Sequence, residues 1–183
     1  MNTSLFLFPL PALEAPPEFS TVRAALEAGG FLGTRLDQDR YAVGPRFFNY
    51  MTFAGCSPHL QMETSAEGGW RFCHLQIHAD ESPRLRMIPR RSRPRCPACR
   101  SSLPGWSENL EEWKRDASRM VRCPACDARM PVGDLDWRQY GLASRCSVEI
   151  HQVYPGEALP QDGLLQLLGE ATGRTWSYAW AES

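Results

Sequence analysis

A five-residue motif occurs twice in this chain, and it restricts the fold more than any other feature of the sequence. The run Arg-Cys-Pro-Ala-Cys occupies residues 95–99 and returns 27 residues later at residues 122–126. A tight turn lets two cysteines spaced in this way place both sulfur atoms on one metal ion, and the proline restricts the backbone between them. Two such turns supply four thiolates, the tetrahedral ligand set that Zn²⁺ prefers. We therefore expect one zinc ion per chain, with the ligands Cys96, Cys99, Cys123 and Cys126.

A site closed by four cysteines has no coordination position left for water or substrate. The expected zinc is therefore structural, and its binding energy stabilises the module that holds it. The CPxC…CPxC arrangement resembles the zinc-ribbon class of modules over about residues 93–136. This resemblance implies a fold for the segment but no function, because ribbons occur in transcription, in translation and in enzymes alike. Many ribbons have glycine after the second cysteine of each turn, whereas this chain has Arg100 and Asp127.

Other uses of the four cysteines remain open at this point. A redox dithiol uses a single CxxC pair, so a matched double pair favours metal binding. A rubredoxin-like iron site uses the same ligands, but the missing glycines count against it, and free thiols or disulfides are the last alternative. Seven cysteines, four of them in CxxC pairs, fit a reducing compartment, so we expect the cytoplasm.

Outside the cysteine motif, apolar periodicity predicts short strands and two helices. The helices begin after Pro16-Pro17 and after Pro160. The expected strands cover residues 5–10, 50–53, 70–79, 144–154 and 175–180. This order predicts an α+β fold with a small, mostly antiparallel sheet and two helices, and we take a ferredoxin-like layout as the first model. Trp176, Tyr178 and Trp180 alternate along the last strand, so we expect them to face the core of the sheet.

Charge divides the chain into a basic centre and acidic flanks. Residues 84–130 hold eleven Arg and one Lys against five acids, whereas the rest holds eight basic and sixteen acidic residues. Residues 81–94 are rich in proline and arginine and lack periodicity, which is typical of a linker. We therefore predict one α+β domain from residues 1–83 and 137–183, and a basic linker with an inserted zinc ribbon over residues 84–136.

The basic centre suits two kinds of partner. Arginines beside aromatic rings can neutralise phosphates and stack on bases, whereas the simpler interpretation is a solvated linker that pairs with the acidic flanks. The candidate contact residues are Arg90, Arg91, Arg93, Arg95, Trp106 and Trp113. Apolar residues recur at helical spacing from Trp106 to Met120, so we expect a helix that packs the module onto the main domain or binds a partner. A protein is the expected partner, with nucleic acid as the alternative.

No known catalytic signature is complete in this sequence, and we expect a non-catalytic protein. Cys56 and His59 share a tight turn and are weak candidates for a nucleophile and its base, although a buried structural cysteine is the simpler interpretation. A second metal site from these two and His74, His78 and His151 is also conceivable. His74 and His78 lie about 13 Å apart on a straight strand, however, which opposes it. No run of about 18 apolar residues is present, so no membrane span is expected.

Overall fold

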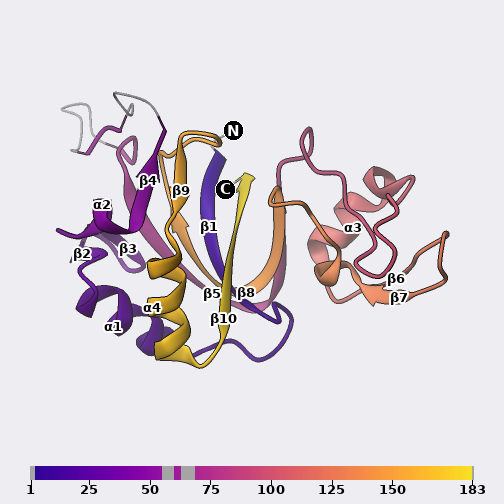
Figure 1. Ribbon diagram of the computed structural model, residues 1–183, viewed down its shortest axis with the longest axis horizontal. Helices are drawn as coiled ribbons and strands as arrows, with labels where there is room; N and C mark the ends of the chain where they lie inside the picture. Colours follow the sequence, from indigo (N-terminus) through magenta and orange to yellow (C-terminus); the bar gives the residue numbers. More distant parts are fainter. Residues whose placement is uncertain (1–2, 55–59, 63–68, 183) are drawn as a thin grey trace.

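A six-stranded antiparallel sheet forms the centre of the structure, a computed structural model that describes residues 3–54, 60–62 and 69–182 (Figure 1). The strand order is β10-β1-β8-β5-β3-β2. The strands are β1 (Thr3–Leu10), β2 (Leu32–Arg35), β3 (Arg40–Val43), β5 (His74–Met87), β8 (Gly141–Ile150) and β10 (Thr175–Glu182). The fold is therefore of the α+β class with a mostly antiparallel sheet, as the sequence predicted.

Two helices, α1 (Phe19–Ala28) and α4 (Asp162–Thr172), pack against each other on one face of this sheet (Figure 1). α1 connects β1 to the strands that follow it, and α4 leads to β10 at the edge of the sheet. The four neighbouring strands β10-β1-β8-β5, with these two crossings, have the β-α-β-β-α-β layout of ferredoxin-like folds. No helix within the described residues has the length and apolar character needed to cross a membrane.

The core of the sheet lies between the strands and these two helices. Val22 and Leu26 of α1 and Leu164 of α4 are fully buried there. Trp176 and Trp180 of β10 are buried in the same core, and Tyr178 packs against it. The last strand therefore uses its aromatic residues as core, in agreement with their alternation.

A hairpin that the sequence analysis did not predict extends the sheet beyond β5. No strand was predicted around Gly33, but β2 pairs with β3, and β3 pairs with β5. A Cβ atom at Gly33 would lie 2.6 Å from the Val43 carbonyl oxygen, so the close pairing needs glycine. The short helix α2 (Phe47–Tyr50) follows, and β4 (Met51–Phe53) pairs with β9 (Ala158–Pro160) beside it.

Strand β5 continues through residues that were expected to form a linker. Its outer part, up to Met87, pairs with β8, and the linker expected over residues 81–94 is wrong for this part. Arginines are tolerated there because Arg84 and Arg86 both pair with Asp80, at 3.3 and 2.9 Å. The register shifts between Ala79 and Arg84, and such irregularities bend a hairpin.

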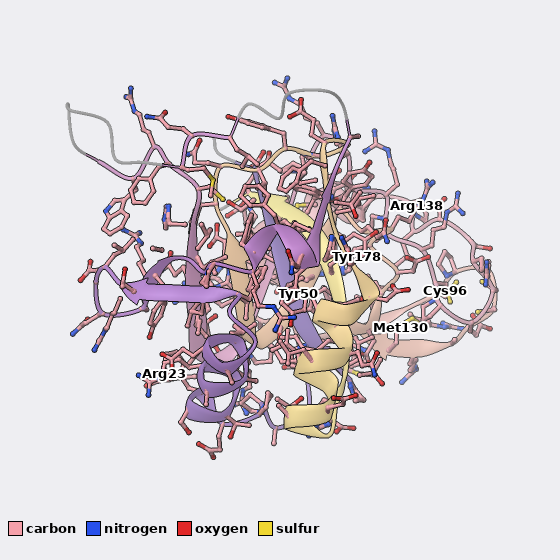
Figure 2. The ribbon with its side chains drawn as sticks, turned by 60° about the vertical axis from the view of Figure 1, so that its left-hand side comes forward. Arg23, Tyr50, Cys96, Met130, Arg138 and Tyr178 are labelled. Carbon is pink, nitrogen blue, oxygen red and sulfur yellow. The ribbon has the colours of Figure 1, made fainter. Side chains whose placement is uncertain are left out.

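The segment between β5 and β8 forms a small module at one end of the sheet (Figure 1). Its elements are η1 (Trp106–Asn109), α3 (Leu110–Arg115), β6 (Met120–Arg122), β7 (Arg129–Pro131) and η2 (Val132–Asp134). A second core joins this module to the outer halves of the two strands through Leu85, Met87, Trp137 and Ala143. Figure 2 shows Cys96 and Met130 at this end, on the opposite side of the view from Arg23.

The helical stripe predicted from Trp106 to Met120 ends early. Trp113 and Ala117 are buried in the second core, so they pack the module as expected. Helix α3 stops before extended backbone at Asp116, whose carboxylate accepts a hydrogen bond from the Ser118 N–H at 3.0 Å. Such a local bond competes with helix formation. Met120 consequently lies in β6, where it is 59% exposed.

Candidate metal centre

The four predicted ligands come together in the module. The sulfur atoms of Cys96, Cys99, Cys123 and Cys126 all lie within 4.8 Å of one another. The Sγ atoms of Cys96 and Cys126 are 3.7 Å apart, and those of Cys99 and Cys123 are 3.6 Å apart. A tetrahedron with Zn–S bonds of about 2.3 Å has S···S edges of about 3.8 Å, whereas a disulfide bond measures about 2.0 Å. The cluster therefore has the spacing of a metal site.

Each cysteine pair sits in a turn with the same hydrogen bonding. The Arg100 N–H donates to the Cys96 carbonyl at 2.8 Å, and the Asp127 N–H donates to the Cys123 carbonyl at 2.9 Å. Arg100 and Asp127 have φ values of 62° and 61°, which is the conformation that favours glycine. The turns accept side chains there, and that of Asp127 pairs with Arg122 at 2.7 Å.

Short strand pairings hold the two turns in place. The second turn connects β6 and β7, which pair antiparallel. In the first turn, Arg95 pairs with both Ser102 and Asp136. The Arg95 N–H donates to the Asp136 carbonyl at 2.9 Å, and the Asp136 N–H donates back at 3.0 Å. Backbone pairing beside each turn thus positions the ligands. Because each Cys-Pro-Ala-Cys run forms a local turn, the repeat in the sequence was sufficient to predict all four ligands.

The exposed members of the cluster, Cys99 and Cys126, influence each other's protonation. Hydrogen bonds from the Ser101 side chain and backbone lower the pKa of Cys99 to about 6. A backbone hydrogen bond from Ala128 favours the thiolate of Cys126, but the neighbouring Cys99 sulfur opposes it, and the pKa of Cys126 rises to about 12. Several thiolates at this spacing repel one another, so they coexist only around a cation.

The predicted contact arginines differ in exposure. Arg90, Arg91 and Arg93 are exposed, and the guanidinium of Arg91 lies 5.6 Å from the ring centroid of Tyr140. Arg95 is half-buried, and its backbone belongs to the pairing that supports the first cysteine turn. The first three side chains are therefore available to a partner, whereas Arg95 has a structural position.

The two predicted contact tryptophans lie in the module core rather than on a free surface. Trp113 is buried, Trp106 is half-buried, and both meet the ring of Trp137 edge-on, with centroids 6.3 and 6.0 Å away. Both tryptophans also line a groove of about 450 Å³, which Arg119 and Met120 complete. Trp106 is thus the most accessible of the three described tryptophans in this cluster.

The predicted catalytic pair, Cys56 and His59, lies outside the described residues. The second metal site, which included these two residues, therefore stays a prediction, but the three described histidines do not form a metal cluster among themselves. In the part of the chain that the structure describes, the four cysteines alone have three or more ligand atoms at metal spacing.

A buried carboxylate links the histidines instead, which the sequence analysis missed. Glu149 is 2% exposed, and its Oε2 atom lies 2.7 Å from His78 Nε2. Its Oε1 atom lies 3.4 Å from Nδ1 of His151, whose ring stacks on His74 with centroids 4.2 Å apart. Alternation along β8 placed Glu149 on the polar face of its strand, but alternation does not show that this face is covered.

The histidine cluster predicts a decrease in stability at acidic pH. Burial lowers the pKa of His151 to about 4, against the opposing charge of Glu149. Since the unfolded value is about 6.5, the stability that neutral His151 contributes is complete above that pH and is lost as the pH falls towards 4. We expect this term to lower the free energy of unfolding by about 2 kcal/mol between pH 7 and pH 5.

Urea unfolding of the wild type and of His151→Gln over this pH range tests the effect. The variant shares the cysteine cluster, so the difference between the two curves isolates His151. Its curve should be flatter than that of the wild type. Parallel curves would show that His151 does not titrate as its burial implies.

Comparisons with known proteins assign no family to this chain. It matches no protein-family model, and neither a curated protein nor a solved structure shows significant similarity to it. The four-cysteine cluster, with the spacing of a metal site, is the functional feature that the geometry supports.

Proposed function

We propose that this chain is a zinc-binding, non-catalytic protein that acts as a protein-interaction or regulatory adaptor. The observation that carries the proposal is the set of four sulfur atoms within 4.8 Å, in two turns of matching geometry. Four protein ligands fill a tetrahedral ion, which supports a structural role for the metal. One Zn²⁺ per chain then joins the two halves of a zinc ribbon.

The remaining described cysteines support a reducing environment and argue against thiol chemistry. Burial raises the pKa of both Cys73 and Cys146 to about 12, so these thiols remain protonated and unreactive at neutral pH. Both are free rather than disulfide-bonded. We therefore place the protein in the cytoplasm, where thiols stay reduced.

A protein partner is favoured by the groove on the ribbon. Its lining combines Trp106, Met120 and Arg119, and aromatic residues, methionine and arginine are enriched in protein interfaces. Met120 is the most exposed of these apolar groups, and it sits beside the half-buried Trp106. The groove is therefore the part of the ribbon on which a partner can bury apolar surface.

Nucleic-acid binding is the second candidate, because three exposed arginines lie close together in sequence. Within the described residues, Arg90, Arg91 and Arg93 form no ion pair with a carboxylate. Anisotropy of labelled single-stranded DNA and RNA tests this candidate. Binding that weakens steeply with salt would support it, and no binding at low salt would remove it.

Native mass spectrometry with elemental analysis of the same sample tests the metal. We expect one zinc per chain, complete loss of zinc in Cys96→Ser, and unchanged zinc in the control Cys73→Ser. Iron, a second metal ion or an absence of metal in the wild type would contradict a closed zinc site.

A further inference from the structure

Strand β10 forms one edge of the main sheet, and part of this edge has unpaired backbone groups. Its inner side pairs with β1 along the whole strand. On the outer side, the Trp180 N–H donates to the Gln139 carbonyl at 2.8 Å. Backbone groups alternate in direction along a strand, so those of Trp176 and Tyr178 point to the same outer side as those of Trp180. Within the described residues, these groups of Trp176 and Tyr178 have no backbone partner.

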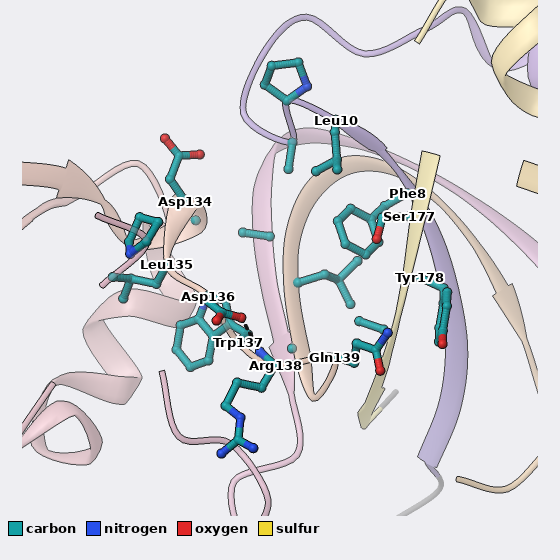
Figure 3. Close-up of a pocket in the computed structure, with 18 residues that line it drawn as sticks. Phe8, Leu10, Asp134, Leu135, Asp136, Trp137, Arg138, Gln139, Ser177 and Tyr178 are labelled. Carbon is teal, nitrogen blue, oxygen red and sulfur yellow. Dashed lines mark hydrogen bonds between the residues drawn. The ribbon is translucent and has the colours of Figure 1, made fainter. Parts of the chain in front are cut away.

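A cavity of about 600 Å³ lies beside this edge, between β10 and the ribbon (Figure 3). Phe8 and Ser177 lie on the side of the cavity formed by β1 and β10, and Asp134 and Asp136 lie on the opposite side (Figure 3). The apolar part of its lining includes Phe8, Leu142 and Ala179, which belong to one buried cluster. This volume lies in the range of sites that hold small molecules.

The wall opposite β10 has a strained backbone. Arg138 and Gln139 have φ values of 53° and 64°, which is unfavourable for residues other than glycine. The Tyr140 N–H donates to the Trp137 carbonyl at 3.0 Å, and the Asp136 carboxylate accepts the Arg138 N–H at 2.9 Å. These bonds hold the turn at residues 137–140, and this turn points the Gln139 carbonyl at the Trp180 N–H of β10. Backbone strain of this kind is commonly retained at binding sites.

We propose that the cavity binds an extended peptide segment of a partner protein, which adds to the outer edge of β10. The backbone N–H and C=O groups of Trp176 and Tyr178 are spaced as in a strand. The backbone of an added strand satisfies these donors and acceptors together. The bond between Trp180 and Gln139 shows that this edge accepts a backbone partner. Residues 176–179, of which the last three line the cavity, provide roughly 13 Å of strand, which is enough to pair with about four residues of a peptide.

The cavity also defines the side chains of the bound segment. Every second residue of an added strand points to one face, so alternate side chains enter the apolar lining formed by Phe8, Leu142 and Ala179. The rim carries the two carboxylates of Asp134 and Asp136 against a single guanidinium, that of Arg138. The favoured segment therefore has apolar residues at alternate positions and a basic residue beside them.

The ribbon forms part of this site, so the inference rests on the proposed function. Pro97, between two of the cysteine ligands, lines the cavity, and Arg95 next to the first ligand pairs with Asp136 on the rim. A folded ribbon is therefore needed to keep the cavity wall in place. Peptide binding should require the zinc-loaded protein, whereas zinc binding should not require the peptide.

Selection from a phage-displayed library of random nine-residue peptides tests the proposal, with the zinc-loaded protein as target. Selected peptides are then synthesised and measured by calorimetry. Ser177→Phe places a ring in the cavity from β10, so we expect at least a tenfold loss of affinity. Thr175→Phe is the matched control on the same face of the strand, because Thr175 does not line the cavity. It should bind with unchanged affinity.

N-methylation of the peptide tests the pairing without changing the protein. Strand addition predicts that methylation at alternate residues abolishes binding, whereas methylation at the residues between them is tolerated. Failure to select a peptide, equal affinity for Ser177→Phe and the wild type, or tolerance of methylation at every position would overturn the inference. Any of these results, obtained with zinc still bound, would contradict peptide binding but not the zinc site. Absence of zinc from the wild type would contradict both the zinc site and the peptide site.

Discussion

Removal of the metal is expected to unfold the ribbon and to leave the helix-covered part of the sheet folded. A structural zinc site contributes roughly 10–16 kcal/mol of binding free energy, which is comparable to the whole stability of an ordinary domain. Its strands β6 and β7 have three residues each, so the ribbon depends on the metal and on the second core that joins it to the sheet. Hydrogen exchange should show loss of amide protection over residues 95–137 after chelation, with protection in β1 and β10 retained.

Two controls make this result specific. Zinc added after chelation should restore the protection, and Cys123→Ser should behave like the chelated wild type under all conditions. Cys73→Ser, which changes a buried thiol of the main core, should keep a protected ribbon. Full protection of the ribbon amides in a metal-free sample would contradict the structural role of the metal.

Trp137→Ala is expected to lower the free energy of unfolding by about 3–5 kcal/mol, because it removes a large aromatic side chain from the joint between ribbon and sheet. The ring is 3% exposed, and its Nε1–H donates to the Val132 carbonyl at 3.2 Å. Trp106 and Trp113 both pack edge-on against it. Its loss should leave a cavity bordered by η1, α3 and η2, which carry Trp106, Trp113 and Val132. Urea unfolding of the zinc-saturated protein measures the change.

Met120→Ala is the matched control, since Met120 belongs to the same ribbon but is 59% exposed. We expect it to change the stability by less than about 0.5 kcal/mol. Equal effects of the two substitutions would mean that the ribbon does not depend on its contact with the sheet. The predicted division of the chain at residues 83 and 137 would then separate the main domain and the ribbon into two independent units. This division stays a prediction.

Local patterns in the sequence were sufficient for the cysteine cluster and for much of the sheet. The repeated Cys-Pro-Ala-Cys run encodes its own turn, and neighbouring backbone bonds complete it. Alternation around Leu75 and Ile77 located the inner half of β5, because one face of that strand packs on the main core. The second predicted helix is α4, and Gly173 in the left-handed conformation ends it.

Contacts between distant residues determined what the sequence could not show. Arg84 and Arg86 read as linker residues, but pairing with β8 and with Asp80 makes them part of a strand. Met120 continued a helical spacing that Asp116 had already interrupted. The burial of Glu149 depends on side chains of other strands that cover it. For Arg84, Arg86 and Glu149, contacts with distant residues set the environment. For Met120, a local hydrogen bond at Asp116 ended the helix before the predicted stripe was complete.

The position of the ribbon within the β5–β8 hairpin has an evolutionary consequence. Met87 and Gly141 face each other in the strand ladder, so the ribbon leaves and re-enters the sheet at neighbouring points, about 5 Å apart. A two-residue turn spans the same gap in an ordinary hairpin. An ancestor with a plain hairpin could thus acquire or lose the whole ribbon by a single insertion or deletion, without any change in the order of its strands.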